Sequence, residues 1–160
     1  LNTVGIGFDG KVLGWMNTIR FLGSRFGYYL AVLGTIFTFR EPYFRISAPG
    51  FFSKSEKLLL CVVSNAPRTG GGFLLSPKAD PTDGLLNLIC CRPLGALKRL
   101  WFLSRVKHGR HINLPVIQHQ LVTQVKIDTN VTLAAQLDGE LIQACSFEIS
   151  VACKKFLFLF

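Results

Sequence analysis

Three Asp-Gly dipeptides are the first features of this sequence that could take part in chemistry. They are Asp9-Gly10, Asp83-Gly84 and Asp138-Gly139. Asp-Gly is a common sequence for a tight turn between two strands, which explains each dipeptide when it is taken alone. A carboxylate beside a glycine can also accept a proton or orient a hydroxyl group, because the glycine lets a substrate approach closely.

Asp138 is the strongest of these candidates for catalysis. Residues 131–137 alternate between two kinds of side chain, as in a strand with one buried face, and Asp138 continues the less apolar row. That row contains Thr132, Ala134 and Gln136. Glu140 follows, so two acids flank Gly139. The pattern favours equally a carboxylate that faces a substrate and one that only caps a turn.

Residues 64–86, SNAPRTGGGFLLSPKADPTDGLL, are the part of the chain richest in turn residues. The three glycines at positions 70–72 allow backbone conformations closed to other residues, and their N–H groups could bind a phosphate. No helix start with Lys-Ser or Lys-Thr follows them, so the segment is not a Walker-type loop. A flexible hairpin connection is the structural alternative.

The same segment contains an oxygen-rich turn. Asp80 and Asp83 bracket Pro81 and Thr82. Mg²⁺ binds to one or two carboxylates, carbonyl oxygens and water, so this turn is a candidate magnesium site. Turns of this composition also form without a metal, with their side chains bound to their own backbone.

Other sites are weakly indicated or excluded by the motifs. His108 and His111 are spaced as two zinc ligands could be, but no third ligand lies nearby in sequence, so we expect a solvated or anion-facing pair. The sequence has no Gly-x-Ser-x-Gly, no His-Glu-x-x-His and no dinucleotide fingerprint. A self-contained hydrolase, metalloprotease or dehydrogenase is therefore disfavoured.

The elements that must position these residues are predicted from periodicity. Apolar residues at helical spacing predict helices over residues 12–26 and 28–39, and a third helix that begins at Pro93. Apolar runs or alternation predict strands over residues 58–63, 85–91, 121–128, 131–137 and 145–151. The predicted fold class is α+β and rich in β structure, a two-layer β-sandwich with helices packed at one end.

Composition limits the remaining choices. The 160 residues suit a single domain, and 18 Lys and Arg against 9 Asp and Glu give a net charge of +9 that attracts phosphates. The longest apolar stretch, residues 28–39, is shorter than the roughly 18 residues of a membrane span. Five cysteines without metal-ligand spacing predict reduced thiols in the cytoplasm. The first ten residues lack an initiating Met and a signal peptide, so an incomplete chain is expected.

Taken in order, four motifs resemble the carboxyl-terminal domain of the diacylglycerol kinase-like lipid kinases, the family that includes sphingosine and ceramide kinases. The motifs are GIGFDG near the start, the segment 64–86, KHGRH at 107–111 and QLDGE at 136–140. The resemblance covers nearly the whole chain. It implies a β-sandwich domain that closes over an amino-terminal nucleotide-binding domain with a GGDGT loop, which this sequence lacks.

The resemblance also implies a role for several residues. Asp138 matches an aspartate proposed as general base or organiser of the reacting hydroxyl, and Gly139 and Glu140 match the side of the cleft that faces the nucleotide. Asp9 matches an aspartate that meets the lipid headgroup in the sphingosine-kinase branch. In that branch, the region of residues 13–39 forms a lipid pocket or gate.

For the metal, the resemblance assigns Asp83, with the backbone carbonyls of Asp80 and Leu85, to a structural magnesium turn of bacterial members. One position departs from the family, since Asn87 stands where many members have Asp. A second carboxylate is therefore not available to assist at that turn.

The expected function is the carboxyl-terminal half of a lipid kinase that phosphorylates a hydroxyl of diacylglycerol or a sphingoid lipid, with ATP as co-substrate and Mg²⁺ as cofactor. The fragment alone is expected to be inactive without its nucleotide-binding domain. We expect a cytoplasmic protein that is peripheral at the membrane. Its basic side chains are expected to contact phosphates, among them Lys98, Arg99, Lys107 and Arg110. A homodimer is left open, and nucleic acid is not expected as a partner.

Two alternatives remain at this point. One is a non-catalytic basic module that binds anionic lipid or nucleic acid, suggested by the net charge and the absent nucleotide loop. The other is the related architecture of the nicotinamide-dinucleotide kinases. A GGDGT motif upstream in the complete gene would favour a kinase over the binding module.

Overall fold

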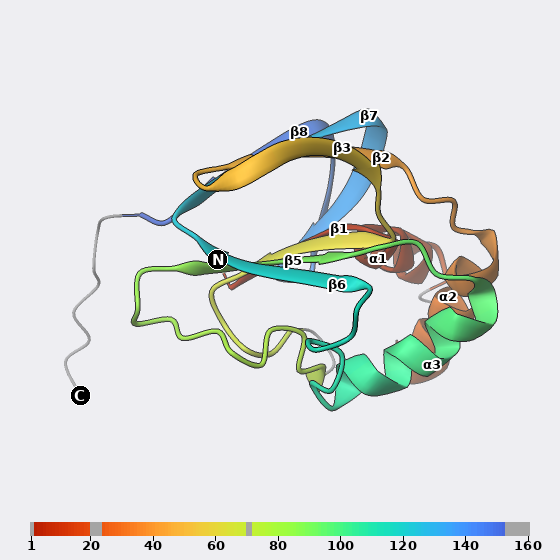
Figure 1. Cartoon of the computed structure of the whole chain (residues 1–160). Helices are drawn as coiled ribbons and strands as arrows, with labels where there is room; N and C mark the ends of the chain where they lie inside the picture. Colours follow the sequence, from red (N-terminus) through yellow and green to blue (C-terminus); the bar gives the residue numbers. More distant parts are fainter. Residues whose placement is uncertain (1, 20–23, 70–71, 153–160) are drawn as a thin grey trace.

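The computed structural model describes residues 2–19, 24–69 and 72–152 (Figure 1). Three helices and eight strands lie within these ranges. The helices are α1 (Phe8–Thr18), α2 (Ser24–Thr38) and α3 (Ala96–Lys107). The strands are β1 (Thr3–Gly7), β2 (Tyr43–Ala48), β3 (Phe51–Lys57), β4 (Leu60–Ser64), β5 (Leu86–Cys91), β6 (Ile117–Val122), β7 (Gln124–Leu137) and β8 (Glu140–Ser150).

All eight strands belong to one antiparallel sheet in the order β3-β2-β7-β1-β4-β5-β6, with β8 paired to β7. The long strand β7 pairs with β2 through residues 126–129 and with β1 through residues 135–137. Because one strand serves both halves, the sheet curls into two layers, with β2, β3 and β8 above β1, β4, β5 and β6 in the view of Figure 1. The predicted β-rich α+β sandwich, with its helices at one end, is confirmed.

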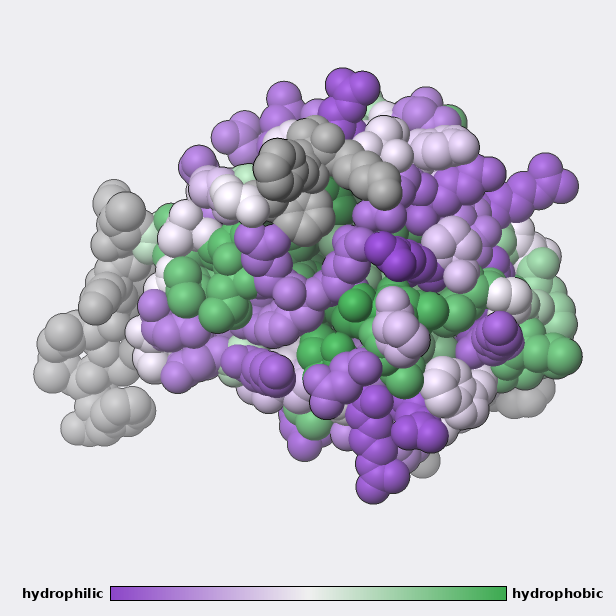
Figure 2. All heavy atoms as spheres, viewed as in Figure 1, coloured by the Kyte–Doolittle hydropathy of each residue, from purple (hydrophilic) through white to green (hydrophobic). Residues whose placement is uncertain are grey.

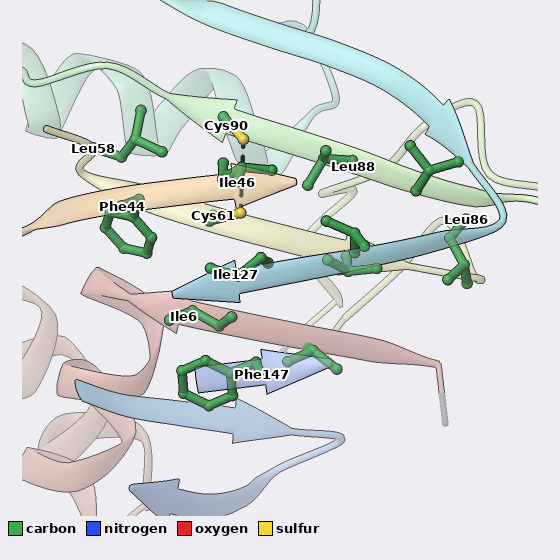
Figure 3. Packing of buried hydrophobic residues seen from close by; sticks show 14 of the residues in the cluster. Ile6, Phe44, Ile46, Leu58, Cys61, Leu86, Leu88, Cys90, Ile127 and Phe147 are labelled. Carbon is green, nitrogen blue, oxygen red and sulfur yellow. Dashed lines mark hydrogen bonds between the residues drawn. The ribbon is translucent and has the colours of Figure 1, made fainter. Parts of the chain in front are cut away.

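The main core lies inside this curl (Figure 3). Its largest fully buried side chains include Ile6, Phe44, Ile46, Leu88 and Ile127, which come from four different strands. A second cluster covers the outer face of β4 and β5, where Val62 and Ile89 pack against the loop residue Leu75 and against α3. The curled sheet therefore has an inner apolar face and an outer face that carries the helices and the segment 65–85.

The cysteines lie mostly in these cores. Cys61 of β4 and Cys90 of β5 are directly opposite in register, and their sulfur atoms are 3.6 Å apart inside the main core. Cys91 points to the outer cluster, as strand alternation predicts for a neighbour of Cys90. Cys61, Cys90, Cys91 and Cys145 are free thiols, and Cys153 lies outside the described residues.

Several predicted boundaries were wrong. Residues 3–7 form a buried strand that periodicity did not reveal, since all five residues are buried on both faces and do not alternate. The first helix begins at Phe8 and not at Val12, and α3 begins at Ala96, three residues after Pro93. The strands predicted over 121–128 and 131–137 are in fact the end of β6 and the continuous strand β7. Leu22, which was assigned to the first predicted helix, lies outside the described residues.

Helix α1 lies very close to the sheet because it carries glycine where it crosses β7. A Cβ atom added at Gly10 would lie 2.1 Å from the backbone oxygen of Ala134. Helix α2 packs on α1 in the same way, since a Cβ at Gly34 would lie 2.4 Å from the Trp15 ring. These glycines allow the helices to approach closely and so place the start of α1, with Asp9, directly on the outer face.

The prediction that Arg99 meets phosphates was wrong. Its guanidinium group is buried, with 8% of the side chain exposed, and it forms an ion pair with Glu41. The same group donates to the carbonyl oxygens of Leu94 (2.8 Å) and Ile36, at the ends of α3 and α2. Arg99 therefore joins these two helices, while Lys98, Lys107 and Arg110 are exposed.

None of the described helices combines the length and the apolar character that crossing a bilayer requires.

Candidate functional site

The Asp138-Gly139 dipeptide forms the turn between β7 and β8. Both residues have positive φ angles, 47° and 97°, the combination that a two-residue type I′ turn requires. The Asp138 carboxylate is exposed and accepts hydrogen bonds from the backbone N–H groups of Asn2 and Thr3, both at 2.8 Å. The carboxylate thus fixes the end of β7 to the beginning of β1, and Glu140 is exposed on the far side of the turn.

Gln136 connects this turn to residues 65–72, which we call the glycine-rich segment. Its amide oxygen accepts a hydrogen bond from the N–H of Gly139 (3.0 Å), and its amide nitrogen donates to the Thr69 hydroxyl (3.4 Å). The side chain is 93% buried, since only 7% is exposed. Gln136 is therefore the residue that links Thr69 to the Asp138-Gly139 turn.

Asp9 lies on the same outer face, in the first turn of α1. It packs over Gly5, where an added Cβ would lie 2.1 Å from the Asp9 Oδ2 atom. Gly5 is opposite Gln136 in the β1–β7 register, so Asp9 and Gln136 are neighbours. Burial raises the pKa of the Asp9 carboxyl, and a hydrogen bond with the Gln136 side chain offsets part of this increase. Asp9 is thus biased towards its neutral form.

Tyr28 of α2 borders Asp9. Burial, with smaller contributions from the charges of Asp9 and Tyr29, raises the pKa of the Tyr28 phenol to about 12. Its ring lies 6.2 Å from that of Phe73, at the end of the glycine-rich segment. On the side of α2, Asp9 therefore has an uncharged phenol as a neighbour.

Four buried side-chain atoms have no hydrogen-bond partner among the described residues. They are Thr3 Oγ1, Asp9 Oδ2, Asn87 Nδ2 and His111 Nδ1. Thr3 and Asn87 are both opposite Ser64 in register and so lie in one row across β1, β4 and β5. The other nitrogen of His111 bonds to the carbonyl of Leu75, within the segment that covers this row. Because buried polar groups are normally satisfied, these atoms indicate a place for water or for polar groups of a ligand.

The predicted metal turn is an exposed loop before β5. One oxygen of Asp80 accepts from the Thr82 hydroxyl (2.6 Å) and N–H (2.9 Å), and these bonds lower the pKa of the Asp80 carboxyl. Asp83 accepts from the N–H of Leu85 (2.8 Å). The Asp83 carboxylate and the carbonyls of Asp80 and Leu85 are oxygens of the hard type that Mg²⁺ prefers. The described residues contain no group of three His, Cys, Asp or Glu side chains placed to hold a metal.

The structure therefore brings some of the predicted site residues together and leaves others apart. Gly139 is bonded to Gln136, Gln136 neighbours Asp9, and Asp138 lies in the same turn. Among the described residues no hydrogen bond links the turn at Asp80 and Asp83 to this group. Gly70 and Gly71 lie outside the described residues, and Gly72, with a φ of 80°, has the positive backbone angle expected of such a segment.

The histidine pair was predicted only in part. His108 is exposed and contacts the Ser104 carbonyl at 3.0 Å, whereas His111 is fully buried and is not an anion-facing residue. Gln136 and Thr69 were missed as site residues. Gln136 had a visible signal, since it lies two positions before Asp138 in the same row of the strand, but Thr69 had none, because its role depends on how a long loop folds back.

Comparisons with known proteins identify the family and the fold of this chain. Residues 2–157 match the model of the family described as the YegS C-terminal NAD kinase beta sandwich-like domain. A "Diacylglycerol kinase" of Mycobacterium tuberculosis is 29% identical over 122 residues, which cover 76% of this chain and 40% of that protein. The "Putative lipid kinase YtlR" of Bacillus subtilis is 24% identical over 157 residues, which cover 94% of this chain and 51% of that protein.

A solved structure has the same fold. It is the "Crystal structure of a putative diacylglycerol kinase from Bacillus anthracis str. Sterne", which superposes with a TM-score of 0.68 at 21% identity and covers 94% of this chain and 49% of that one. The chain thus spans about half the length, or less, of the relatives that it matches. From the extent of the family match, the chain belongs to the YegS C-terminal NAD kinase beta sandwich-like domain family, whose matched relatives here are named as lipid kinases.

Proposed function

We propose that this chain is the substrate-side half of a lipid kinase that transfers the γ-phosphoryl group of ATP to a hydroxyl of diacylglycerol or a sphingoid lipid. The names of the matched relatives support the reaction class. The observation that carries the proposal is the pair of hydrogen bonds made by Gln136, which join the Asp138-Gly139 turn to the glycine-rich segment beside Asp9.

In this proposal Asp138 acts on the lipid hydroxyl. Its carboxylate is exposed, and the N–H groups of Asn2 and Thr3 fix its orientation. An ionised carboxylate has about four acceptor positions, so two remain for a hydroxyl group even while both oxygens accept from the backbone. A carboxylate oriented in advance loses little freedom on binding the hydroxyl, and this is the main contribution that positioning makes to phosphoryl transfer.

Asp9 binds the lipid headgroup in this proposal. A neutral, buried carboxyl can donate one hydrogen bond and accept others, which matches the hydroxyl groups of diacylglycerol and the polar head of a sphingoid lipid. Its Oδ2 atom has no partner among the described residues, and α2 supplies the apolar wall expected for an acyl chain. The gate role of the two amino-terminal helices is part of the same proposal.

The nucleotide and the metal complete the proposed reaction. Gly139 and Glu140 face the nucleotide-binding domain of the longer protein, which would bind most of the ATP. Asp83, with the carbonyls of Asp80 and Leu85, would hold a structural Mg²⁺. When bound, Mg²⁺ supplies positive charge that neutralises phosphate oxygens. The 160-residue chain alone is expected to be inactive.

Phosphoryl transfer by the complete enzyme from labelled ATP to a panel of lipids tests the proposal. The panel should contain diacylglycerol, sphingosine, ceramide and, as a control for the related architecture, NAD. Labelled phosphatidic acid or sphingosine phosphate is the expected product. Transfer to none of the lipids by an enzyme that binds ATP would contradict the proposal.

A further inference from the structure

Two helices of the outer layer expose apolar side chains that the fold does not use. Tyr29, Leu33 and Phe37 of α2 are exposed to 66%, 46% and 60%, and Leu97, Leu100 and Trp101 of α3 to 78%, 39% and 48%. We call these six residues the helical apolar face. In Figure 2 hydrophobic side chains gather at the right-hand end of the molecule, the end at which Figure 1 places α2 and α3. Isolated exposed apolar residues are ordinary, but a cluster on two adjacent helices indicates a contact surface.

Helix α3 shows most clearly that this surface is separate from the core. Its Arg99, Phe102 and Val106 are buried, and its Ala96 and Leu103 pack against the cluster that contains α2. At 100° per residue, Leu97, Leu100 and Trp101 occupy a stripe on the opposite side. These three side chains belong to none of the buried apolar clusters of the described residues, although leaving apolar surface in water is costly.

The charges around the stripe select the partner. Lys98 and Arg105 lie along one edge of the α3 stripe by helical spacing, and Lys107 lies along the other. The Arg105 guanidinium group lies 4.9 Å from the centre of the Trp101 ring. Neither α2 nor α3 contains an acidic residue. A second copy of this face would bring like charges together, whereas anionic lipid phosphates would complement them.

We propose that the helical apolar face docks on the surface of an anionic lipid bilayer. In that position α2 and α3 lie in the interface, with Leu97 and Phe37 among the acyl chains and Trp101 and Tyr29 at the level of the headgroups, where such amphipathic rings are favoured. Lys98, Arg105 and Lys107 contact lipid phosphates. The inference rests on the proposed function in one respect, because only a lipid kinase needs to reach a membrane lipid. The choice of an anionic lipid rests on the basic residues of α3 and on the lack of acidic residues in α2 and α3.

Flotation of the purified chain with vesicles tests the docking without any catalytic step. Phosphatidylcholine vesicles with and without phosphatidylglycerol are compared, for the wild-type chain and for the double variant Leu97→Gln/Trp101→Gln. Because these side chains are exposed, the variant is expected to keep the wild-type melting temperature. Its partition coefficient on phosphatidylglycerol vesicles should fall about tenfold or more, as expected from lost apolar contact.

Two further variants separate the contribution of the basic residues to vesicle binding from that of exposed apolar residues in general. Lys98→Gln/Lys107→Gln should weaken binding about fivefold or more for each removed charge at low salt, and less at high salt. Leu121→Gln/Val131→Gln is the matched control, since these side chains are equally exposed (47% and 49%) on β6 and β7. The control should bind within about twofold of wild type, because its sites lie outside the proposed docking surface.

Three results would overturn the docking proposal. The first is that the wild-type chain binds neither kind of vesicle. The second is that the Leu97→Gln/Trp101→Gln variant binds vesicles as wild type does. The third is that the wild-type chain is a dimer and this variant a monomer, which would make the face a self-association surface. Failure of the proposed function is a separate result. In the complete enzyme, with lipid presented in detergent micelles, Leu97→Gln/Trp101→Gln should phosphorylate as wild type does even when it no longer binds vesicles.

Discussion

The amide oxygen of Gln136 accepts a hydrogen bond from the backbone N–H of Gly139, at 3.0 Å. This bond runs from within strand β7 to the second residue of its own turn, so it fixes the positive φ angles of Asp138 and Gly139 from inside the sheet. Because the other end of the same amide donates to Thr69, the turn and the glycine-rich segment are positioned by one buried side chain. A buried amide used at both ends is expected to be sensitive to substitution.

The close approach of α1 to β7 predicts opposite effects for two glycines of the same helix. Gly10→Ala should destabilise the fold by about 3 kcal/mol or more, because the new Cβ would lie 2.1 Å from the Ala134 backbone, which cannot move independently of the sheet. Gly14→Ala is the matched control, since its Cβ would meet only Leu141 at 3.8 Å. It should stabilise the fold by up to about 1 kcal/mol through helix propensity. Chemical unfolding measures both, and equal effects would contradict the described packing.

The buried carboxyl of Asp9 predicts a pH-dependent stability difference. Its pKa is raised above 3.8 in the folded chain, so the folded state binds the proton more tightly than the unfolded state does. The free energy of unfolding therefore decreases as the pH rises from 3.8 through the folded pKa, because the buried carboxyl must then ionise. Asp9→Asn should therefore match wild type below pH 3.8 and become more stable than wild type at neutral pH. The check is the free energy of unfolding at both pH values. A difference independent of pH would show that Asp9 is not desolvated.

His111 predicts a loss of stability on the acid side of neutrality. Burial lowers its pKa below 6.5, so the folded chain favours the neutral ring; this stability is present above pH 6.5 and is lost as the pH falls. His111→Gln should reduce the slope of melting temperature against pH below 6.5. Burial, then the charge of Lys78, also lowers the pKa of His119, so a double variant with His119→Gln should show the smallest slope. An unchanged slope in the double variant would contradict this assignment.

The Arg99–Glu41 ion pair predicts an asymmetric cost. Arg99→Met should destabilise the fold by about 3 to 5 kcal/mol, because it leaves Glu41 partly buried without its partner and two helix-end carbonyls without a donor. Arg99→Met/Glu41→Gln should recover part of that loss, which a double-mutant cycle measures. Lys98→Met, one residue away and exposed, should change stability by less than about 0.5 kcal/mol. Equal losses in the Lys98 and Arg99 variants would rule out the pair as a stabilising contact.

Comparison of these sites with the sequence shows what periodicity can and cannot reveal. Strand β5 was predictable because a short continuous apolar run is typical of a strand buried on both faces, and the strand before Asp138 was predictable from its alternation. Strand β1 was not, because it is also buried on both faces but its threonine and two glycines leave neither an alternation nor a continuous apolar run. Arg99 resembled its exposed neighbours, and only the packing of α3 on α2 distinguishes it. The turn at Asp138 was visible as Asp-Gly, whereas its bonds to Asn2 and Thr3 depend on the pairing of strands that are distant in sequence.

The central claim is that Asp138 acts on the lipid hydroxyl and is more than a residue of the turn. The most direct measurement is the turnover of diacylglycerol phosphorylation by the complete enzyme carrying Asp138→Asn. Asp128→Asn is the control, because it alters a carboxylate within β7 that accepts a hydrogen bond from Ser146, away from the Asp138-Gly139 turn. We expect Asp138→Asn to lower turnover by about 10²-fold or more, the range for a positioned general base, with circular dichroism and melting temperature close to wild type. Near-normal turnover in a folded Asp138→Asn enzyme would contradict the claim.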